Sequence, residues 1–442
     1  MKTNFTVILM LLLNVCFGQD GVSSGSYSMV KSNGMNSYNE SGRLNNRMII
    51  VEDFVNYHKH KISIPEKKAL AVSIDYSNEL TDDKSRFIMQ VGLATAKKGN
   101  LEKTSADVNI SLVIDQSGSM SGGKMHSVKD ALKVFVRQLE NGMHLSLITF
   151  SDNAGVAVNT LKITADRDRI YRVIEGIQPN GSTNINAGMM LGYEELLKMH
   201  HKGMNSRLIL LTDGMTNQGE TNLEKILANS KGYNVKGIEI STIGVGDQLD
   251  FDLLRSLAEN GKGSNHFIGD NEIDIQKVFI TELESLLYQI GKNPEVTIMV
   301  PQGYKIVKVY GYQPRYILNN KISIGLENLN ADTTQVILIE VERSRSSGNE
   351  LLVQTLYDID GKVIAMTEKV RYKPGTGSTN DELAKNYCIA LMADALKQYS
   401  AEYVRGHNPS KTVLQEALAF ADKHSNTNDI DVKRTYDILK KI

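Results

Sequence analysis

Apolar and polar positions follow different rhythms in successive parts of the chain. From residue 108 to about residue 291, short apolar runs alternate with stretches in which apolar residues recur every three or four positions. The short runs predict buried strands and the periodic stretches predict helices. The expected strands are 108–115, 145–150, 155–159 (at an edge), 208–213, 238–245 and 266–268. The expected helices are 124–139, 167–177, 185–200, 223–229, 251–260 and 275–290.

This alternation predicts an α/β fold for residues 108–291. Each crossover is long enough to connect parallel strands, so we expect a doubly wound, mostly parallel sheet with helices on both faces. After Pro294 the pattern becomes simple alternation without helices, which predicts a β-sandwich-like domain over 292–373. Its expected strands are 296–300, 336–341, 351–357 and 363–366, with Asp360-Gly361 as a hairpin turn.

The last part of the chain, 374–442, returns to helical periodicity. Residues 374–377 (Pro-Gly-Thr-Gly) predict a hinge, and Thr379 with Glu382 forms a plausible capping box. We expect two or three helices here, interrupted at 407–409. Cys388 lies in an apolar helical pattern and is expected to be a buried thiol, because the other cysteine, Cys16, lies near the start of the chain.

The amino-terminal residues predict export. Lys2 precedes the apolar run 5–13, which is too short to span a bilayer and is typical of a secretory signal, so we assign a signal peptide to 1–18. The Ser-, Asn- and Gly-rich residues 19–47 predict a flexible linker. We therefore expect a periplasmic or extracellular protein. Acylation of Cys16 is the less favoured alternative because Asn14 and Val15 are poor residues ahead of such a cysteine.

Residues 48–107 form an accessory segment between the linker and the α/β region. A short helix is expected at 51–58 and strands at 69–74 and 86–93. No later apolar stretch is long enough to span a membrane. The 50 Lys and Arg residues nearly balance the 51 Asp and Glu residues, which argues against nucleic acid or an anionic membrane as a general partner.

Five oxygen-bearing residues are placed where expected strands end or helices begin. Asp115, Ser117 and Ser119 follow the first strand of the α/β region, Thr183 precedes a helix, and Asp213 ends another strand. Parallel sheets bind ligands at the carboxyl ends of their strands, where these loops meet. Two carboxylates and three hydroxyls gathered there suit a hard divalent cation.

Each of these residues also has an ordinary structural interpretation. Ser117 and Ser119 are equally typical of turns or helix caps, Ser182 or Thr183 suits the cap of the following helix, and Asp213-Gly214 suits a plain turn. These interpretations weaken when the residues are considered together. They leave unexplained why three separate loops at one edge of one sheet all offer oxygen.

The five positions resemble the metal-ion-dependent adhesion site of von Willebrand factor A (vWA) domains. The order Asp115-x-Ser117-x-Ser119, Thr183 and Asp213-Gly214 is complete, and the resemblance covers 108 to about 291. Residues 51–57 also resemble, more weakly, the accessory segment of exported bacterial vWA proteins. By this resemblance, Ser117, Ser119 and Thr183 contact the metal directly or through water. Asp115 and Asp213 bond to its waters or switch inward.

A binding function follows from the chemistry of such a site. Mg²⁺, or Mn²⁺ or Ca²⁺ in its place, keeps waters and open positions, and it retains positive charge if few carboxylates bind it directly. It then accepts an Asp or Glu carboxylate from a protein partner. We expect a non-enzymatic adhesion or scaffold module, with the loops 178–184 and 215–220 setting specificity. A metal-dependent hydrolase and an envelope component with a vestigial site remain the alternatives.

Enzymatic and other metal motifs have less support. The stretch Gly118 to Lys124 satisfies most of a phosphate-binding loop, but Met125 stands where Ser or Thr must hold Mg²⁺. A phosphatase with an aspartyl nucleophile at Asp115 would usually have a second acid two residues later, where this chain has Ser117. His58 with His60, and His200 with His201, have no further ligands at suitable spacing, so surface histidines are expected. The sequence leaves the oligomeric state open.

Overall fold

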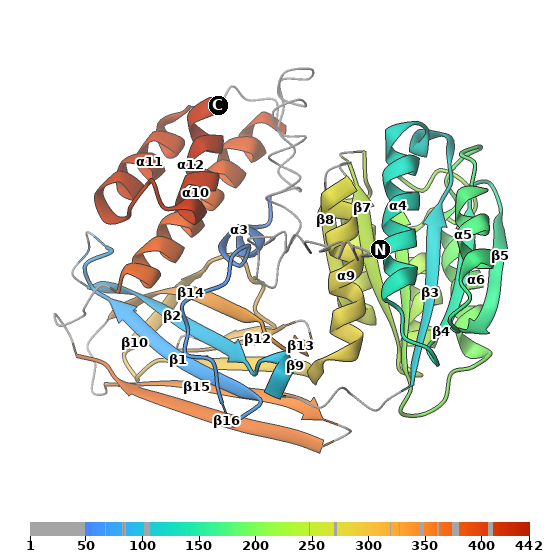
Figure 1. Cartoon of the computed structure of the whole chain (residues 1–442). Coiled ribbons are helices and arrows are strands. Elements are labelled where there is room, and N and C mark those ends of the chain that lie inside the picture. The colour runs from blue at the N-terminus through green and yellow to red at the C-terminus, as the bar shows by residue number, and fades with distance from the viewer. Residues whose placement is uncertain are drawn as a thin grey trace, which may run out of the picture.

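The computed structural model describes residues 49–442 except 67, 82, 84, 101–106, 247, 269–271, 319, 327, 344–348, 360–361, 374–379 and 405–409. The signal peptide, the linker and Cys16 therefore lie outside the described residues. The same holds for the hinge at 374–377, for Thr379, for the turn at 360–361 and for the break at 407–409. The described chain forms an α/β domain beside a body made of two β-sheets and further helices (Figure 1).

The α/β domain is built on one six-stranded sheet of order β5-β4-β3-β6-β7-β8, in which only β5 is antiparallel. It is doubly wound and mostly parallel, as the sequence predicts. Its strands are β3 (Val108–Asp115), β4 (His144–Phe150), β5 (Ala154–Lys162), β6 (Asn205–Thr212), β7 (Ile238–Val245) and β8 (Lys262–Ile268). Its helices are α4 (Gly123–Gln138), α5 (Asp168–Glu175), α6 (Ile185–Leu197), α7 (Leu223–Asn234), α8 (Phe251–Gly261) and α9 (Glu272–Leu287).

Helices cover both faces of this sheet, and each face has its own apolar core. Ile110, Leu112 and Ile114 of β3 pack against α4, α5 and α9, whereas Val113 of the same strand packs on the side of α6, α7 and α8. Strands covered on both faces read as continuous apolar runs, which is why β3 and β7 are buried along their whole length. The polar exceptions concentrate at the strand ends and build the candidate site.

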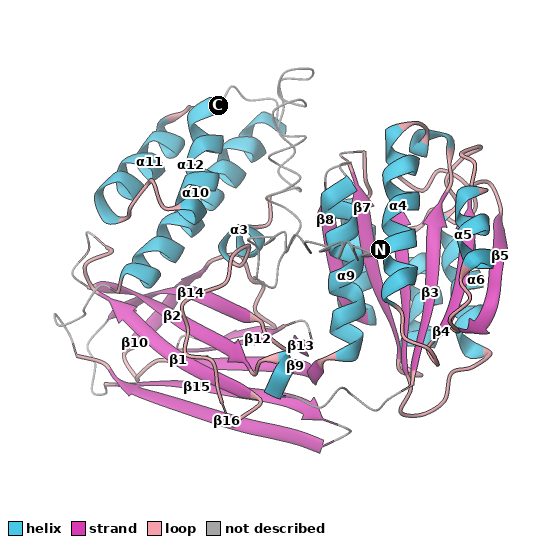
Figure 2. Cartoon of the chain, viewed as in Figure 1, coloured by secondary structure: helices cyan, strands magenta, loops and turns pink. Residues whose placement is uncertain are grey.

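The second body contains two antiparallel sheets packed face to face (Figure 2). One sheet has the order β1-β2-β14-β10 and the other has the order β11-β12-β9-β15-β16, with β13 added beside β9. The first consists of β1 (Leu70–Ser77), β2 (Arg86–Thr95), β14 (Thr334–Arg343) and β10 (Tyr304–Val309). The second consists of β9 (Gln289–Met299), β11 (Tyr316–Leu318), β12 (Lys321–Gly325), β13 (Leu329–Asn330), β15 (Glu350–Ile359) and β16 (Lys362–Arg371).

The accessory strands and the later β-rich region share one sheet, because β2 pairs with β14 along nearly its whole length. The α/β domain is therefore inserted in sequence between β2 and β9. β2 is buried at every position after Arg86 because its faces have different covers: Met89 and Val91 face the second sheet, whereas Ile88 and Gln90 face helix α10.

Three helices, α10 (Asp381–Val404), α11 (Thr412–His424) and α12 (Ile430–Lys441), cover the outer face of that first sheet (Figure 1). Asn386 of α10 donates to Gln90 of β2 at 2.9 Å. Cys388, also on α10, is a buried free thiol, which confirms the expectation from the sequence. The short helix α3 (Val51–Val55) packs against α10. No helix within the described ranges is long and apolar enough to cross a bilayer.

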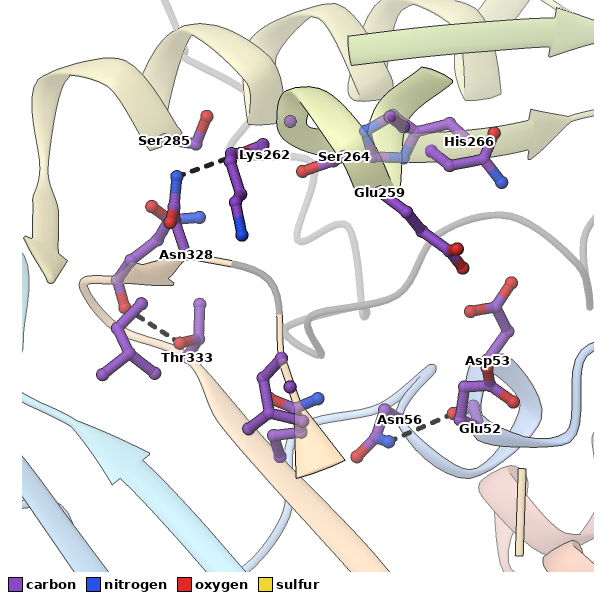
Figure 3. A pocket seen from close by; sticks show the side chains of 18 of the residues that line it. Glu52, Asp53, Asn56, Glu259, Lys262, Ser264, His266, Ser285, Asn328 and Thr333 are labelled. Carbon is purple, nitrogen blue, oxygen red and sulfur yellow. Dashed lines mark hydrogen bonds between the residues drawn. The ribbon is translucent and has the colours of Figure 1, made fainter. Parts of the chain in front are cut away.

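A cavity of about 420 Å³ lies between the α/β domain and the β-sheet body. Arg255 of α8 reaches across it to Glu52 of α3, with 3.0 Å between Nη2 and Oε1. Figure 3 shows Glu259 directed toward Asp53 and Glu52 from the opposite wall. Burial, aided by the neighbouring Asp53, raises the pKa of Glu52 to about 7. The two bodies are thus joined through a polar and partly buried contact.

Candidate metal centre

The loops after β3 and β6 meet at the carboxyl edge of the α/β sheet. These two strands are neighbours, and the winding of the chain reverses between them: β4 continues on one side of β3, whereas β6 lies on the other. Such a switch point leaves a crevice above the strand ends. Asp115 is the last residue of β3, and Asp213 directly follows the last residue of β6.

The five sequence-predicted side chains converge on this crevice. Ser119 Oγ donates to Asp213 Oδ1 at 2.6 Å and lies 3.0 Å from Ser117 Oγ. Thr183 reaches the same place from the loop before α6. An atom at the Cβ position of Gly214 would lie 3.4 Å from Thr183 Oγ1 and 3.8 Å from Ser119 Oγ. Both hydroxyls therefore lie beside Gly214, where a side chain would crowd them.

Asp115 lies beneath the hydroxyls and is fixed by two hydrogen bonds. Its Oδ1 accepts the Ser117 N–H at 2.7 Å, and its Oδ2 accepts the Thr212 hydroxyl at 2.5 Å. The residue is fully buried. Burial raises the pKa of Asp115 to about 6, although the bonds from Thr212 and Ser117 oppose the rise. A cation above this carboxylate would favour its ionised form.

The loops that carry these residues are bonded to one another through their backbones. The Gly118 N–H donates to Gly181 O at 3.0 Å, and the Asn180 N–H donates to Gln116 O at 2.7 Å. On the other side, the Thr183 N–H donates to Asn217 Oδ1 at 2.8 Å. The positions of the loops are therefore set largely by their backbone groups, and the hydroxyls that bond one another and Asp213 keep lone pairs for an ion.

The ordinary structural roles of the five residues are filled by other groups. Asn184, and neither Ser182 nor Thr183, caps α6 by accepting the Ala187 N–H at 3.1 Å. Ser117 precedes the short 3-10 turn at Gly118–Met120 without capping it through its side chain. The turn after β6 is stabilised by Thr212, whose hydroxyl accepts the Gly214 N–H at 3.2 Å. Capping and turn formation thus do not account for the oxygens.

Lys124 is a member of the cluster that sequence reasoning did not assign to it. Its Nζ lies 2.6 Å from Asp213 Oδ2, and the Asp213 side chain has no exposed surface. A basic side chain at the start of α4 thus already holds a positive charge against this carboxylate. The signal in the sequence was the position of Lys124 in the phosphate-loop-like stretch, but its partner lies 89 positions away.

The same geometry weakens the nucleotide-binding alternative. Met125, at the position where a phosphate-binding loop needs a hydroxyl for Mg²⁺, is buried in the core beneath α4. Lys124, which would bind phosphate, is paired with Asp213 instead.

Two features make the cluster suitable for a hard divalent cation. Its donors are hydroxyl and carboxylate oxygens, the ligands that Mg²⁺ and Ca²⁺ prefer, and Asp213 already attracts a cationic group. Ser119 is the exposed residue among the five, and the other four are buried.

The expectation that the paired histidines lie on the surface is wrong for His58 and His60. They are only 4 % and 3 % exposed, because the segment after α3 passes beneath α10 and α12. His201 is exposed, as expected, and His200 is half-buried, where it contacts Ser206 and the Lys236 carbonyl.

Comparisons with known proteins agree with the architecture of the sheet. Residues 109–280 match the model of the von Willebrand factor type A domain. The solved structure of von Willebrand factor type A from Catenulispora acidiphila superposes with a TM-score of 0.58 at 17 % identity, covering 87 % of this chain and 92 % of that one. At this identity the likeness shows the fold alone.

Two curated relatives illustrate how far the sequence similarity extends. The Escherichia coli (strain K12) protein YfbK is 26 % identical over 348 residues, which are 76 % of this chain and 56 % of YfbK. Inter-alpha-trypsin inhibitor heavy chain H2 of Homo sapiens is 34 % identical over 172 residues, which are 37 % of this chain and 18 % of the relative. The chain thus matches about half of the first relative and about a fifth of the second.

These findings define a doubly wound α/β domain with an oxygen-rich crevice at its switch point. Residues 109–280 match a von Willebrand factor type A domain, and the rest of the described chain adds antiparallel sheets and carboxyl-terminal helices. Domains of this family commonly mediate protein–protein interaction and adhesion.

Proposed function

We propose that the chain is an exported, non-enzymatic module that binds a protein partner through a divalent cation. Asp115, Ser117, Ser119, Thr183 and Asp213 hold the ion, and Mg²⁺ is the favoured ion over Mn²⁺ or Ca²⁺. When bound, the ion supplies an electrophilic centre for an Asp or Glu carboxylate of the partner. The observation that carries this proposal is that oxygens from three loops lie close together at the end of β3, beside Asp115.

The surroundings of the site support binding in preference to catalysis. The Ser117 amide and the Thr212 hydroxyl hold the Asp115 carboxylate in one orientation, as suits a group that positions an ion. Met215, on the loop beside Asp213, exposes 57 % of its surface. An exposed apolar side chain next to a charged centre suits contact with another protein.

Export is part of the proposal and depends on the amino-terminal sequence. The charged start and the apolar run 5–13 are typical of a secretory signal. Secretion or transfer to the periplasm would place the site where adhesion to an external partner takes place. Amino-terminal sequencing of protein recovered outside the cytoplasm tests this directly, with Gln19 as the expected first residue.

Thermal unfolding in EDTA and in added Mg²⁺ tests the metal site. An ion at about a hundredfold over its dissociation constant should stabilise the protein by ~2.7 kcal/mol. The melting temperature should then rise by roughly 5–10 °C. Asp115→Ala should abolish the rise, whereas Asp166→Ala, which removes an exposed acid from the same domain, should retain it.

Three other results would change the conclusion. An equal rise in Asp115→Ala would place the ion elsewhere. No rise with any of Mg²⁺, Mn²⁺ and Ca²⁺ would favour an envelope component with a vestigial site. Metal-dependent hydrolysis that disappears in Asp115→Ala would favour the enzyme.

A further inference from the structure

A second polar cluster lies outside the vWA domain, where the segment after α3 meets the carboxyl-terminal helices. We call the candidate metal centre at Asp115 and Asp213 the vWA rim. One nitrogen from each of His58 and His60 and one oxygen of Glu382 lie within 4.8 Å of one another. All three residues are buried. We call this set the His58–Glu382 cluster. Two imidazoles and a carboxylate form a ligand set typical of zinc and related transition-metal ions.

Hydrogen bonds on the far side of His60 fix its proton. Asn56 Oδ1 accepts the Val336 backbone N–H at 2.8 Å, which identifies this atom of the Asn56 amide as the oxygen. His60 Nε2 lies 3.0 Å from the same oxygen and must therefore donate its N–H. In the neutral ring, the proton is then on Nε2 and the lone pair is on Nδ1.

The lone pair on His60 Nδ1 faces another hydrogen-bond acceptor, the carboxylate of Glu382. His60 Nδ1 lies 3.4 Å from Glu382 Oε1 and, among the described residues, has no hydrogen-bond partner. His58 Nε2 is also buried without one, and its nearest acidic oxygen is Asp431 Oδ2 at 3.9 Å. Two buried acceptors that face each other are unfavourable unless a proton or a cation lies between them.

A proton is the less suitable of the two. A proton between His60 Nδ1 and Glu382 Oε1 would leave His58 Nε2 without a partner, whereas one ion can accept a lone pair from each ring. Neutral imidazole and ionised carboxylate are the forms that bind metals.

The charges around the cluster select the kind of metal. Lys385 Nζ lies 3.1 Å from Glu382 Oε2 and 3.3 Å from Asp431 Oδ2, and Arg434 bonds the other oxygen of Asp431 at 3.0 Å. The two acids are thus already balanced by two bases. Mg²⁺ and Ca²⁺, which depend on carboxylates, are disfavoured here. An ion that binds neutral imidazole strongly is favoured.

We propose that His58, His60 and Glu382 bind one zinc-class divalent ion, which clamps the segment after α3 to helix α10. Glu382 Oε1 faces the ion while Oε2 stays with Lys385. The Asn56 side chain holds His60 in the orientation for binding. Because the cluster is buried, it has no position open to a substrate, so the ion is structural. It ties together parts of the chain that are 321 positions apart at the Lys61–Glu382 contact.

The test uses the full exported chain with Asp115→Ala, so that binding at the vWA rim does not contribute. After treatment with EDTA and its removal, Co²⁺ is added and its visible ligand-field absorption is followed; Zn²⁺ is then titrated by competition and by calorimetry. We expect one Co²⁺ to bind, one Zn²⁺ to displace it, and excess Mg²⁺ not to displace it.

Matched variants locate the ion. Glu382→Gln and His60→Gln should each weaken Zn²⁺ binding on the order of 100-fold. His126→Gln, which removes an exposed histidine of α4, should leave it unchanged. If either cluster variant fails to fold, X-ray absorption of the zinc-loaded Asp115→Ala chain decides the question, because the proposal requires two imidazole nitrogens around the metal.

Three results would overturn the proposal. The first is Zn²⁺ affinity unchanged in folded Glu382→Gln, and the second is a coordination shell without imidazole. The third is a ¹⁵N spectrum in which His60 carries two protons, with and without zinc, which would show that a proton completes the cluster. None of these results bears on Mg²⁺ binding at the vWA rim, which is measured in the chain without Asp115→Ala.

Discussion

Two buried clusters in this protein each pair histidine with glutamate, but only one of them is complete without an added ion. In the vWA domain, His266 Nε2 lies 2.7 Å from Glu282 Oε1, and Arg207 bonds Glu282 Oε2 at 3.1 Å and Glu239 Oε2 at 2.5 Å. In the His58–Glu382 cluster, two ring nitrogens have no hydrogen-bond partner within the described part of the chain.

The comparison teaches that burial and residue type alone do not identify a metal site. Both clusters contain a carboxylate whose pKa is held at about 2 by neighbouring groups despite burial. Glu282 faces a guanidinium and a ring N–H, so each of its oxygens meets a donor. The oxygens of Glu382 also meet donors, from Lys61 and Lys385, but the two neighbouring ring nitrogens, His58 Nε2 and His60 Nδ1, do not have hydrogen-bond partners among the described residues. The distribution of donors therefore separates a structural network from a site that lacks a cation.

The largest effect is expected from removing Arg207, the base that pairs with both Glu239 and Glu282 in the vWA domain. Arg207→Met should lower the free energy of unfolding by ~3–5 kcal/mol, because it leaves Glu239 and Glu282 buried without their shared partner. Urea denaturation of the metal-free protein measures the loss. The control is Arg255→Met, whose half-exposed ion pairs should contribute less than about 1 kcal/mol.

A small loss in Arg207→Met would mean that the vWA cluster is not held by its guanidinium. Binding of a second zinc ion to that variant, in addition to the one expected at the His58–Glu382 cluster of the parent chain, would be equally informative. It would show that His266 and Glu282 bind metal once the competing base is gone, and hence that Arg207 excludes an ion from this cluster.

Glu52 provides an intermediate case, a buried acid with an incomplete set of partners. Its pKa of about 7 in the folded protein lies above the ordinary value of 4.5, so the folded state binds the extra proton between these two pH values. The free energy of unfolding should therefore fall as pH rises from about 4.5 to 7, by at most about 3 kcal/mol from this group, and its contribution should level off above 7.

Glu52→Gln should remove this slope. Urea denaturation at pH 5 and pH 8 should show the variant losing less stability than the parent chain over that interval. Glu259→Gln, an exposed acid on the same Arg255, serves as the control and should keep the slope. Equal slopes in Glu52→Gln and the parent chain would show that the carboxylate is ionised in the folded state throughout.

The sequence predicted elements well where periodicity was strong and poorly where pairing decided the outcome. The strands at 108–115 and 238–245 were predicted with the bounds of β3 and β7. The helix expected to reach residue 290 ends at Leu287, because Gln289 already pairs with β13 as part of β9. β10 to β13 were missed, since they are short and depend on partners that are distant in sequence.

The same limit applies to the sites. The vWA residues were predictable because each lies at a strand end or before a helix, where position alone shows that they meet. His58 and His60 were placed on the surface because nothing near them in sequence offers a third ligand. Glu382 joins them only through the packing of α10 on α3. Lys124 was assigned to a loop motif, and only the fold places it beside Asp213.

The smallest effect is expected from removing Lys124, the base that pairs with Asp213 at the vWA rim. Here a buried carboxylate is paired with a lysine whose side chain is 28 % exposed, so this base is free to move away when an ion arrives. Lys124→Met removes a charge that repels the ion and competes for Asp213 Oδ2. Mg²⁺ affinity should rise about tenfold, or ~1.4 kcal/mol.

Calorimetric titration of the parent chain and the variant measures this, with Lys129→Met on the same helix as the control. Unchanged affinity would mean that Lys124 bonds the carboxylate without opposing the ion, and weaker binding would make it a positioning residue for Asp213.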